Sequence, residues 1–412
     1  MCFKILTLFI ICLILDTPVV LGDQTGNGES EQLRLDLLKV RLLYETDRDM
    51  EALRLSELLL EKYPQDSRVL SNLAYIEWRI GQWRKAYMLY NQAIKIEPDN
   101  EGIVMGRDKL WHEQASRVKI RHAWKNISGA GGWEERLTDA NGHIFIADYT
   151  RLGVIYHNNS VKTDSIRRAD GKIAPFEGMR NRGEIFLQHD AENSSIIKLS
   201  LLANSSTPGA GVLFSLWDIS GRTVLFGELK HPYWDYIEGI IEDGTRDRIG
   251  ITREQKLGSR LNLQLGTAFE QYGIPADDNV AASQSVSGNL RFIVVKMQPL
   301  VTLGYNLDAD YLISIDKRAD SAGVEYNPWT IRSREIHSLD VTVSYFIEGF
   351  LTDGYAGYSS DRLGAHGAFY GVSFTYIPIE DIEIIINYDR GLNSVITSQT
   401  IEHIRGSLVW RF

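Results

Sequence analysis

The sequence lacks several features that identify common classes of protein. Only two cysteines occur among 412 residues, and both of them, Cys2 and Cys12, lie close to the amino terminus. Beyond that terminus there is no apolar run of the roughly 20 residues that a spanning helix needs. The net charge of -10 is unfavourable for binding a polyanion. The sequence therefore predicts neither a helical membrane protein nor a nucleic-acid partner, and it offers little for a disulfide framework.

Motifs for catalysis or metal binding are also missing. There is no nucleophile elbow and no paired metal motif, and Gly129 to Gly132 lack the strand-to-helix context of a phosphate-binding loop. A metal site needs three or four converging donors, but the histidines from residue 143 onward are scattered singly: His143, His157, His189, His231, His337, His366 and His403. We expect no catalytic residue, no metal site and no cofactor.

The amino terminus has the pattern of an export signal. Lys4 supplies a positive charge, residues 5–15 form an apolar run, and Val20, Leu21 and Gly22 precede a plausible cleavage site. The pattern predicts a signal peptide over 1–22 and a linker over 23–32, with a retained anchor as the alternative. Removal of the leader leaves a mature chain without a thiol, which suits an oxidising compartment.

Residues 33–120 have the pattern of helices that repeat. Apolar residues recur at helical spacing, and a shift of 34 positions places Ala52 on Ala86, Leu59 on Ala93 and Pro64 on Pro98. The helical faces contain Leu33, Leu37, Val40, Leu43 and Tyr44, then Leu55, Leu58 and Leu59. This predicts repeats over 33–66 and 67–100, followed by a capping helix over 101–120.

The second copy resembles the tetratricopeptide repeat. Its motif positions are occupied by Leu70, Leu73, Ala74, Gly81, Ala86, Tyr90, Ala93 and Pro98. The resemblance implies a pair of antiparallel helices that approach closely at Ala74 and Ala86, and a helix that Pro98 terminates. Two interpretations of Trp78, Trp83 and Trp111 remain open, packing between helices and docking of a partner.

From residue 121 onward apolar and polar residues alternate, which predicts strands. In residues 305–316 the odd positions are mostly apolar and most of the even positions polar. Residues 261–270, 339–348 and 382–389 follow the same scheme. A transmembrane barrel, with one face toward lipid and one toward water, accounts for so many carboxylates opposite apolar faces.

The connections between these segments predict the number of strands. Short turns are expected near 150–153, 192–194, 219–222, 256–259, 297–299, 334–337 and 377–381. Longer gaps are expected at 128–141, 161–181, 204–209, 232–244, 273–283, 317–323, 351–363 and 391–399. Alternating short and long connections are typical of outer-membrane barrels. The count gives about 16 strands over 121–412, with 14 as the alternative, and it places both barrel ends on the side of the helical domain.

The last segment carries a signal of its own. Ile404, Leu408, Trp410 and Phe412 share one face of a strand that ends the chain. It resembles the closing strand of bacterial outer-membrane β-barrels, in which the terminal Phe is read by the assembly machinery. The resemblance implies insertion into outer-membrane lipid, with the helical domain in the periplasm.

Acidic residues dominate the polar faces of the clearest strands. They are Glu270, Asp308, Asp310, Asp316, Asp340, Glu348, Glu383 and Asp389. Basic residues are few on the same strands, so the lumen is expected to favour cations. The alternative is an ordinary wall of solvated charge, cancelled in part by arginines such as Arg291 and Arg405.

One expected outer loop, residues 231–238, is both aromatic and acidic. Tyr233, Trp234 and Tyr236 would suit stacking on sugar rings. An aromatic belt or a plug would equally explain them.

Together the two halves resemble the exopolysaccharide-export porins, which include the Pel, poly-N-acetylglucosamine and cellulose secretion proteins, and the barrel is most similar to the Pel type. The resemblance implies a channel that secretes an exopolysaccharide, and periplasmic repeats that recruit a polysaccharide-modifying enzyme or an assembly protein. An acidic lumen would suit a cationic amino-sugar polymer. The short repeat array departs from the family pattern. The alternative function is a plugged barrel that anchors a periplasmic interaction scaffold.

Overall fold

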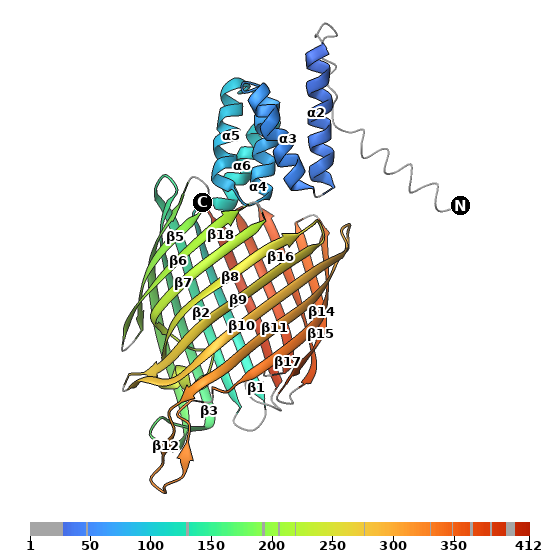
Figure 1. Ribbon diagram of the computed structural model, residues 1–412. Coiled ribbons are helices and arrows are strands. Elements are labelled where there is room, and N and C mark those ends of the chain that lie inside the picture. Colours follow the sequence, from blue (N-terminus) through green and yellow to red (C-terminus); the bar gives the residue numbers. More distant parts are fainter. Residues whose placement is uncertain are drawn as a thin grey trace, which may run out of the picture.

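The structure is a computed structural model that describes residues 28–46, 48–128, 132–191, 194–204, 207–218, 220–275, 277–329, 331–347, 349–362, 366–379, 381–392 and 400–412. The expected signal peptide and Glu348 lie outside the described residues. Within them, a short helical domain precedes a closed antiparallel barrel (Figure 1).

The helical domain is built from small residues at helix contacts. Its helices are α2 (Gly28–Glu45), α3 (Asp49–Lys62), α4 (Ser67–Arg79), α5 (Trp83–Ile96) and α6 (Glu101–Gln114). Asp66 caps α4 by accepting hydrogen bonds from the backbone N–H groups of Arg68 and Val69. Ala74, Ala86 and Ala93 are fully buried, so neighbouring helices approach without intervening side chains.

Two expected boundaries of this domain differ in the structure. The first helix begins at Gly28, inside the expected linker, and the helix expected to extend to residue 120 ends at Gln114. The barrel then starts at Arg117 instead of residue 121. Residues 117–120 alternate and pair along their length with the last strand, so ladder hydrogen bonds replace the expected last turn of helix.

The barrel contains 16 strands, as the sequence predicts. They are β1 (Arg117–Ser128), β2 (Trp133–Ala147), β3 (Thr150–Arg167), β4 (Ile173–Asp190), β5 (Ile196–Asn204), β6 (Pro208–Asp218), β7 (Gly221–Pro232), β8 (Thr245–Leu257), β9 (Leu261–Ile274), β10 (Asp277–Val295), β11 (Leu300–Ile315), β14 (Arg334–Ile347), β15 (Phe350–Asp361), β16 (His366–Ile379), β17 (Ile382–Leu392) and β18 (Thr400–Arg411). Pairing of β1 with β18 closes the ring. A small hairpin of β12 (Arg318–Ala319) and β13 (Glu325–Tyr326) interrupts the connection between β11 and β14.

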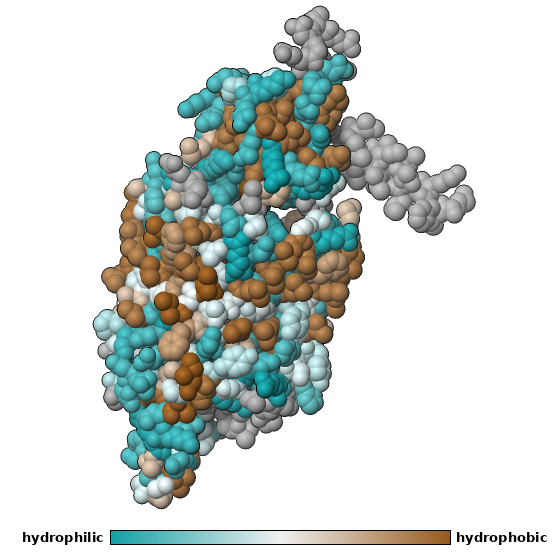
Figure 2. Space-filling model, in the orientation of Figure 1, coloured by the Kyte–Doolittle hydropathy of each residue, from teal (hydrophilic) through white to brown (hydrophobic). Residues whose placement is uncertain are grey.

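The outer surface of the barrel is apolar, as a lipid-facing surface must be. Leu265, Ile313, Leu339 and Ile386 are exposed on it, and Figure 2 shows hydrophobic side chains spread over the barrel wall. Successive residues of a strand face opposite sides, so Gln264 and Asp340 face the lumen. Among the described residues, no helix is long and apolar enough to cross a membrane.

The strand count is correct although several of the expected connections are misplaced. The turn expected at 150–153 lies inside β3, and most of the residues in the gaps expected at 128–141, 161–181 and 273–283 belong to strands.

Two further errors change the count in opposite directions. The turn expected at 334–337 lies inside β14, and the loop expected at 351–363 is mostly β15. The sequence predicts a strand between the gap at 317–323 and the turn at 334–337, but these residues belong mainly to the long connection after β11. The two errors cancel. The sequence predicts a loop at β15 because polar residues and glycines are frequent there. In the structure, β15 is a strand because it pairs with β14 on one side and with β16 on the other.

The helical domain lies at the barrel end that carries the turns β2–β3, β4–β5, β6–β7 and β8–β9 (Figure 1). Trp111 stacks on Phe145 with ring centroids 5.2 Å apart, and Trp83 packs on Tyr149 at 5.6 Å. Arg84 donates a hydrogen bond of 2.6 Å to the Asp190 carbonyl.

Further contacts join the same two parts. Lys256 donates to the Arg79 carbonyl at 3.2 Å, and His112 lies 2.9 Å from Asp381. Trp83 and Trp111 therefore contact the barrel. The sequence left packing between helices and docking of a partner open, and this contact with another part of the same chain is neither of the two.

Candidate functional site: the lumen, its plug and its inner mouth

The connection between β7 and β8 folds back into the barrel and forms a plug, which we define as residues 233–244. Its short helix α7 (Ile237–Ile241) is buried over its full length. Besides its acids, the segment carries aromatic and aliphatic side chains, and burial inside the lumen removes their apolar surface from water. The plug occupies the end of the barrel opposite the helical domain.

The plug packs against two opposite groups of side chains. On one side Trp234, Ile237 and Ile240 form a cluster with residues of β1, β2 and β3: Ile127, Trp133 and Val161. On the other side Tyr233 and Tyr236 join a second cluster with Tyr272, Val280 and Trp329. Contacts on both sides show that the segment crosses the lumen instead of lining one wall.

Two arginines of β4 hold the plug through its backbone. Arg180 donates hydrogen bonds to the carbonyls of Ile240 (3.0 Å) and Ile241 (2.6 Å), which are carbonyls that a helix end leaves unpaired. Arg182 donates to the Pro232 carbonyl at 3.1 Å, and its guanidinium lies 4.7 Å from the centre of the Trp234 ring. Hydrogen bonds from charged donors are stronger than neutral ones, so these contacts favour the inserted position.

The connection between β11 and β14 contacts the plug through Trp329. Trp329 is fully buried and stacks on Tyr233 with ring centroids 5.9 Å apart. A Cβ added at Gly244 would lie 2.4 Å from the Trp329 ring, so a side chain there would force the loops apart. The position requires glycine because of this close approach.

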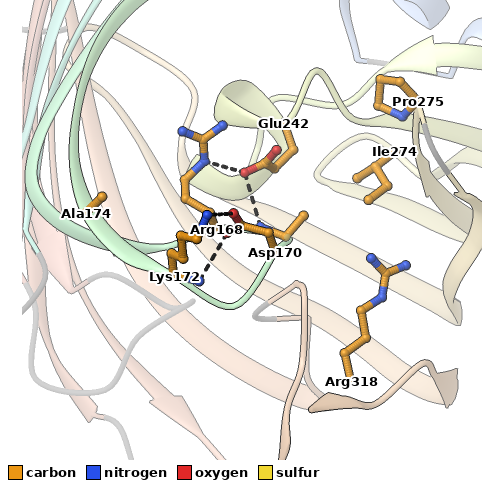
Figure 3. A pocket seen from close by; sticks show the side chains of 9 residues that line it. Arg168, Asp170, Lys172, Ala174, Glu242, Ile274, Pro275 and Arg318 are labelled. Carbon is orange, nitrogen blue, oxygen red and sulfur yellow. Dashed lines mark hydrogen bonds and ion pairs between the residues drawn. The ribbon is translucent and has the colours of Figure 1, made fainter. Parts of the chain in front are cut away.

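The plug also meets the loop between β3 and β4 (Figure 3). Glu242 accepts hydrogen bonds from the Arg168 side chain (2.5 Å) and from the backbone N–H of Ala169 (3.2 Å). The cavity beside this contact has a volume of about 650 Å³, and Arg318 lines its far side. Three outer loops are thus linked to one another.

The three loop aromatics identified from the sequence belong to this plug. Tyr233 is 7% exposed, Trp234 is 7% exposed and Tyr236 is 4% exposed. In this conformation their faces contact protein and are not available to a sugar ring. Of the three interpretations of these residues, the plug is the one that fits.

The carboxylates identified from the sequence are paired with arginines across the barrel wall. Arg246 and Arg248 flank Glu270, Arg334 binds both Asp308 (3.2 Å) and Asp310 (2.7 Å), and Arg318 binds Asp316 at 3.0 Å. The remaining pairs in the described chain are Arg291–Asp340, Arg405–Asp389 and Arg411–Glu383. Bases are few on the strands that carry these acids, but most of the arginines lie on neighbouring strands, where register brings them close to the acids.

The register produces other polar contacts that the sequence does not reveal. Asp139 of β2 lies opposite His157 of β3 and binds both it and Arg121. Asn159 donates a 2.7 Å hydrogen bond to Glu135. Among the described residues no group of three or more His, Cys, Asp or Glu side chains could hold a metal ion.

A cavity of about 370 Å³ lies at the inner mouth, where the helical domain meets the lumen. Trp78 and Trp217 line it, together with the lumen amides Asn262, Gln264 and Asn289. Gly81, which the sequence places in the repeat motif, has φ of +89° and lies directly against the Trp217 ring. Aromatic faces beside several amide groups form a surface suited to a polyhydroxylated ligand, because amides both donate and accept hydrogen bonds.

The remaining residues identified from the sequence are structural in position. Tyr90 is buried with the alanines of the helical core, and Pro98 follows the end of α5. Trp410 and Phe412 face outward, each more than half exposed, with ring centroids 5.2 Å apart. No sequence pattern marks the residues that hold the plug, Arg180, Arg182 and Trp329. Glycines in and beside α7 are the one feature that points to close packing there.

Solved structures with a similar fold are outer-membrane barrels. One, described as a bacterial polysaccharide outer membrane secretin, has a TM-score of 0.50 and 9% identity over 72% of this chain and 98% of that chain. OccK11 of Pseudomonas aeruginosa has a TM-score of 0.39 and 11% identity, over 72% and 96%. OmpF of Salmonella typhi has a TM-score of 0.38 and 8% identity, over 72% and 97%.

No protein-family model matches the chain, and no curated protein is similar to it in sequence. At these identities the likeness concerns the fold alone. The protein is an outer-membrane type of β-barrel with a short helical domain before it.

Proposed function

We propose that this protein is a channel through which an exopolysaccharide leaves the cell. The observation that carries the proposal is the inner-mouth cavity, where two indole rings and three amides meet at the start of a polar lumen. Sugars can use both parts of such a surface, the rings for stacking and the amides for hydrogen bonds. The likeness in fold to a structure described as a polysaccharide secretin supports the same conclusion.

In this proposal the helical domain is a periplasmic adaptor of the tetratricopeptide type. It contacts the turns at one end of the barrel through Trp83, Arg84 and Trp111, so a protein bound to it would deliver polymer beside the inner mouth. A polysaccharide-modifying enzyme or an assembly protein is the expected partner.

The plug is the closed gate of the channel. It is held by hydrogen bonds and packing, without a covalent link, so it can leave the lumen when the loops above it separate. Among the described residues, the lumen acids Asp308 and Asp310 share a single base, Arg334. This local excess of negative charge would suit a partly cationic amino-sugar polymer.

The proposal is tested by trimming the plug. Pro232 and Thr245 are paired, so residues 233–244 can be replaced by an Asn-Gly turn that closes the hairpin between β7 and β8. In planar bilayers the trimmed protein should conduct, and partly acetylated glucosamine oligomers added on the helical side should block the current. Linear polyethylene glycols of equal length serve as the neutral control.

The cavity has its own control. Replacing Gln264 and Asn289 with Leu in the trimmed protein should weaken the block by the sugar oligomers at least tenfold and leave the block by polyethylene glycol unchanged. Equal block by both polymers, or no effect of the two substitutions, would contradict passage of a polysaccharide by this route.

A second function is favoured by the same plug, because a barrel that is closed at one end could serve as a membrane anchor for the helical scaffold. Such an anchor transports nothing. Cells without it would keep their surface polysaccharide and would lose the periplasmic proteins that the helical domain holds near the membrane.

A further inference from the structure

The outer face of α2 carries an apolar stripe that no other described part of the chain covers. Leu35, Leu38 and Leu42 follow one another at helical spacing and are 55%, 53% and 61% exposed. The opposite face of the same helix, with Leu33 and Val40, is buried in the helical core. A helix that is apolar on two sides is expected to be covered on both.

The internal repeat identifies what kind of contact the stripe would make. Thirty-four positions later, Leu35 corresponds to Val69 and Leu42 to Ile76 in α4. Val69 is 1% exposed and Ile76 is fully buried, because α4 is packed between α5 and the preceding helix, α3. Two of the three stripe positions therefore lie where the second repeat is covered, whereas Leu38 corresponds to the half-buried Asn72. No described helix precedes α2.

Helical repeat arrays normally end in a cap whose outer face is polar, since an apolar end invites association. Removing leucine side chains from water is favourable, so a helix that covers these three leucines gains from the contact. We propose that the second helix of a further 34-residue helical repeat, belonging to a separate protein, packs on α2 in the way that α3 packs on α4.

Charge favours a different protein over a second copy of this one. Arg34 and Lys39 lie on the two sides of the stripe, one turn from Leu38 and Leu35, and neither forms an ion pair with a described residue. A second copy would bring the same bases together. The partner is expected to carry acidic residues beside its apolar face. This inference concerns the helical domain and stands whether or not the barrel conducts.

The experiment places a photo-crosslinking amino acid at Leu42 of the full-length protein in the cells that make it. The matched control position is Leu58 of α3, which is also 61% exposed, but whose counterpart in the second repeat, Gln92, is exposed as well. We expect an adduct at position 42 with a protein that mass spectrometry shows to contain 34-residue helical repeats, and at least tenfold less of it at position 58.

Any other result overturns the proposal: no adduct, equal adducts at both positions, a partner without such repeats, or an adduct with a second copy or with the amino-terminal segment of this chain. A second measurement separates docking from folding. The variant Leu35→Gln/Leu42→Gln should abolish the adduct captured at position 38, and hydrogen exchange in α4 should stay unchanged. Faster exchange there would show that the stripe stabilises the fold instead of binding a partner.

Discussion

Arg180 shows how single residues of the lumen can serve closure instead of conduction. Its guanidinium points at backbone carbonyls of α7, whereas most described lumen arginines meet a carboxylate. A buried carbonyl must be paired, and the end of a short helix supplies unpaired ones. The side chain therefore fixes the position of the plug through its backbone, without pairing with a carboxylate of the plug.

Replacing Arg180 with Met should loosen the plug. Each hydrogen bond from a charged donor contributes about 1.5–3 kcal/mol, and each 1.4 kcal/mol changes an equilibrium about tenfold. We expect single-channel recordings to show at least a tenfold rise in open probability. The control is Arg136→Met, since Arg136 is largely exposed and pairs only with Glu134. Identical recordings for the two variants would show that Arg180 does not hold the plug.

Glu77 provides a residue-scale test of the helical domain. It is 1% exposed, and burial raises the pKa of its carboxyl above the ordinary value, although Lys85 beside it acts in the opposite direction. A raised folded-state pKa means that this group contributes stability at low pH, and that this contribution is lost as pH rises through the folded-state pKa.

The variant Glu77→Gln should therefore gain stability relative to the wild type as pH rises from below the ordinary value of 4.5 to neutrality. Hydrogen exchange of α4 amides in the full-length protein measures this difference. The control Glu57→Gln removes an exposed carboxyl near the same lysine and should show no such trend. A gain that falls with rising pH would reverse the assigned sign.

At the scale of elements, strands with regular alternation of apolar and polar residues were predictable from the sequence. Strands that are recognised only by their pairing with neighbours were not. Residues 305–316 and 261–270 read directly as lipid-facing strands, because one face is uniformly apolar. β15 did not, since its identity as a strand depends on two neighbours distant in sequence. The pairing of Arg334 with Asp308 and Asp310 was hidden for the same reason: it joins two strands separated by a long connection.

That pairing bears on the selectivity of the lumen, for which the sequence left two interpretations open. Because most acids are neutralised, the trimmed channel should prefer cations only weakly. Replacing Asp308 and Asp310 with Asn leaves the charge of Arg334 unbalanced, so the reversal potential in a salt gradient should shift toward anions. Asp170→Asn, in a loop outside the wall, is the control. If the reversal potential does not shift, these carboxylates do not set the selectivity. The single variant Asp308→Asn changes the more exposed carboxyl alone, so it tests the same point where the double variant misfolds.

At the scale of the whole molecule, the order of parts was predictable and their contacts were not. A repeat with a period of 34 followed by alternating strands indicates helices before a barrel. Nothing in the local sequence indicates that Trp111 would stack on Phe145 or that Gly81 would receive Trp217. These contacts join the helical repeat to the barrel. Each of the two parts is recognisable in the sequence without the other, so the contacts between them become visible only in the folded structure. The sequence left the plug as one of three interpretations of residues 231–238, because its burial depends on side chains from both walls.

Deletion of the gene shows whether polymer passes through this barrel. We expect a strain without the protein to lose cell-surface polysaccharide, and expression of the wild-type chain to restore it. A variant whose plug is fixed by cysteines introduced into plug and wall should restore it only after reduction. Unchanged surface polysaccharide in the deletion strain would contradict export and leave the barrel as an anchor.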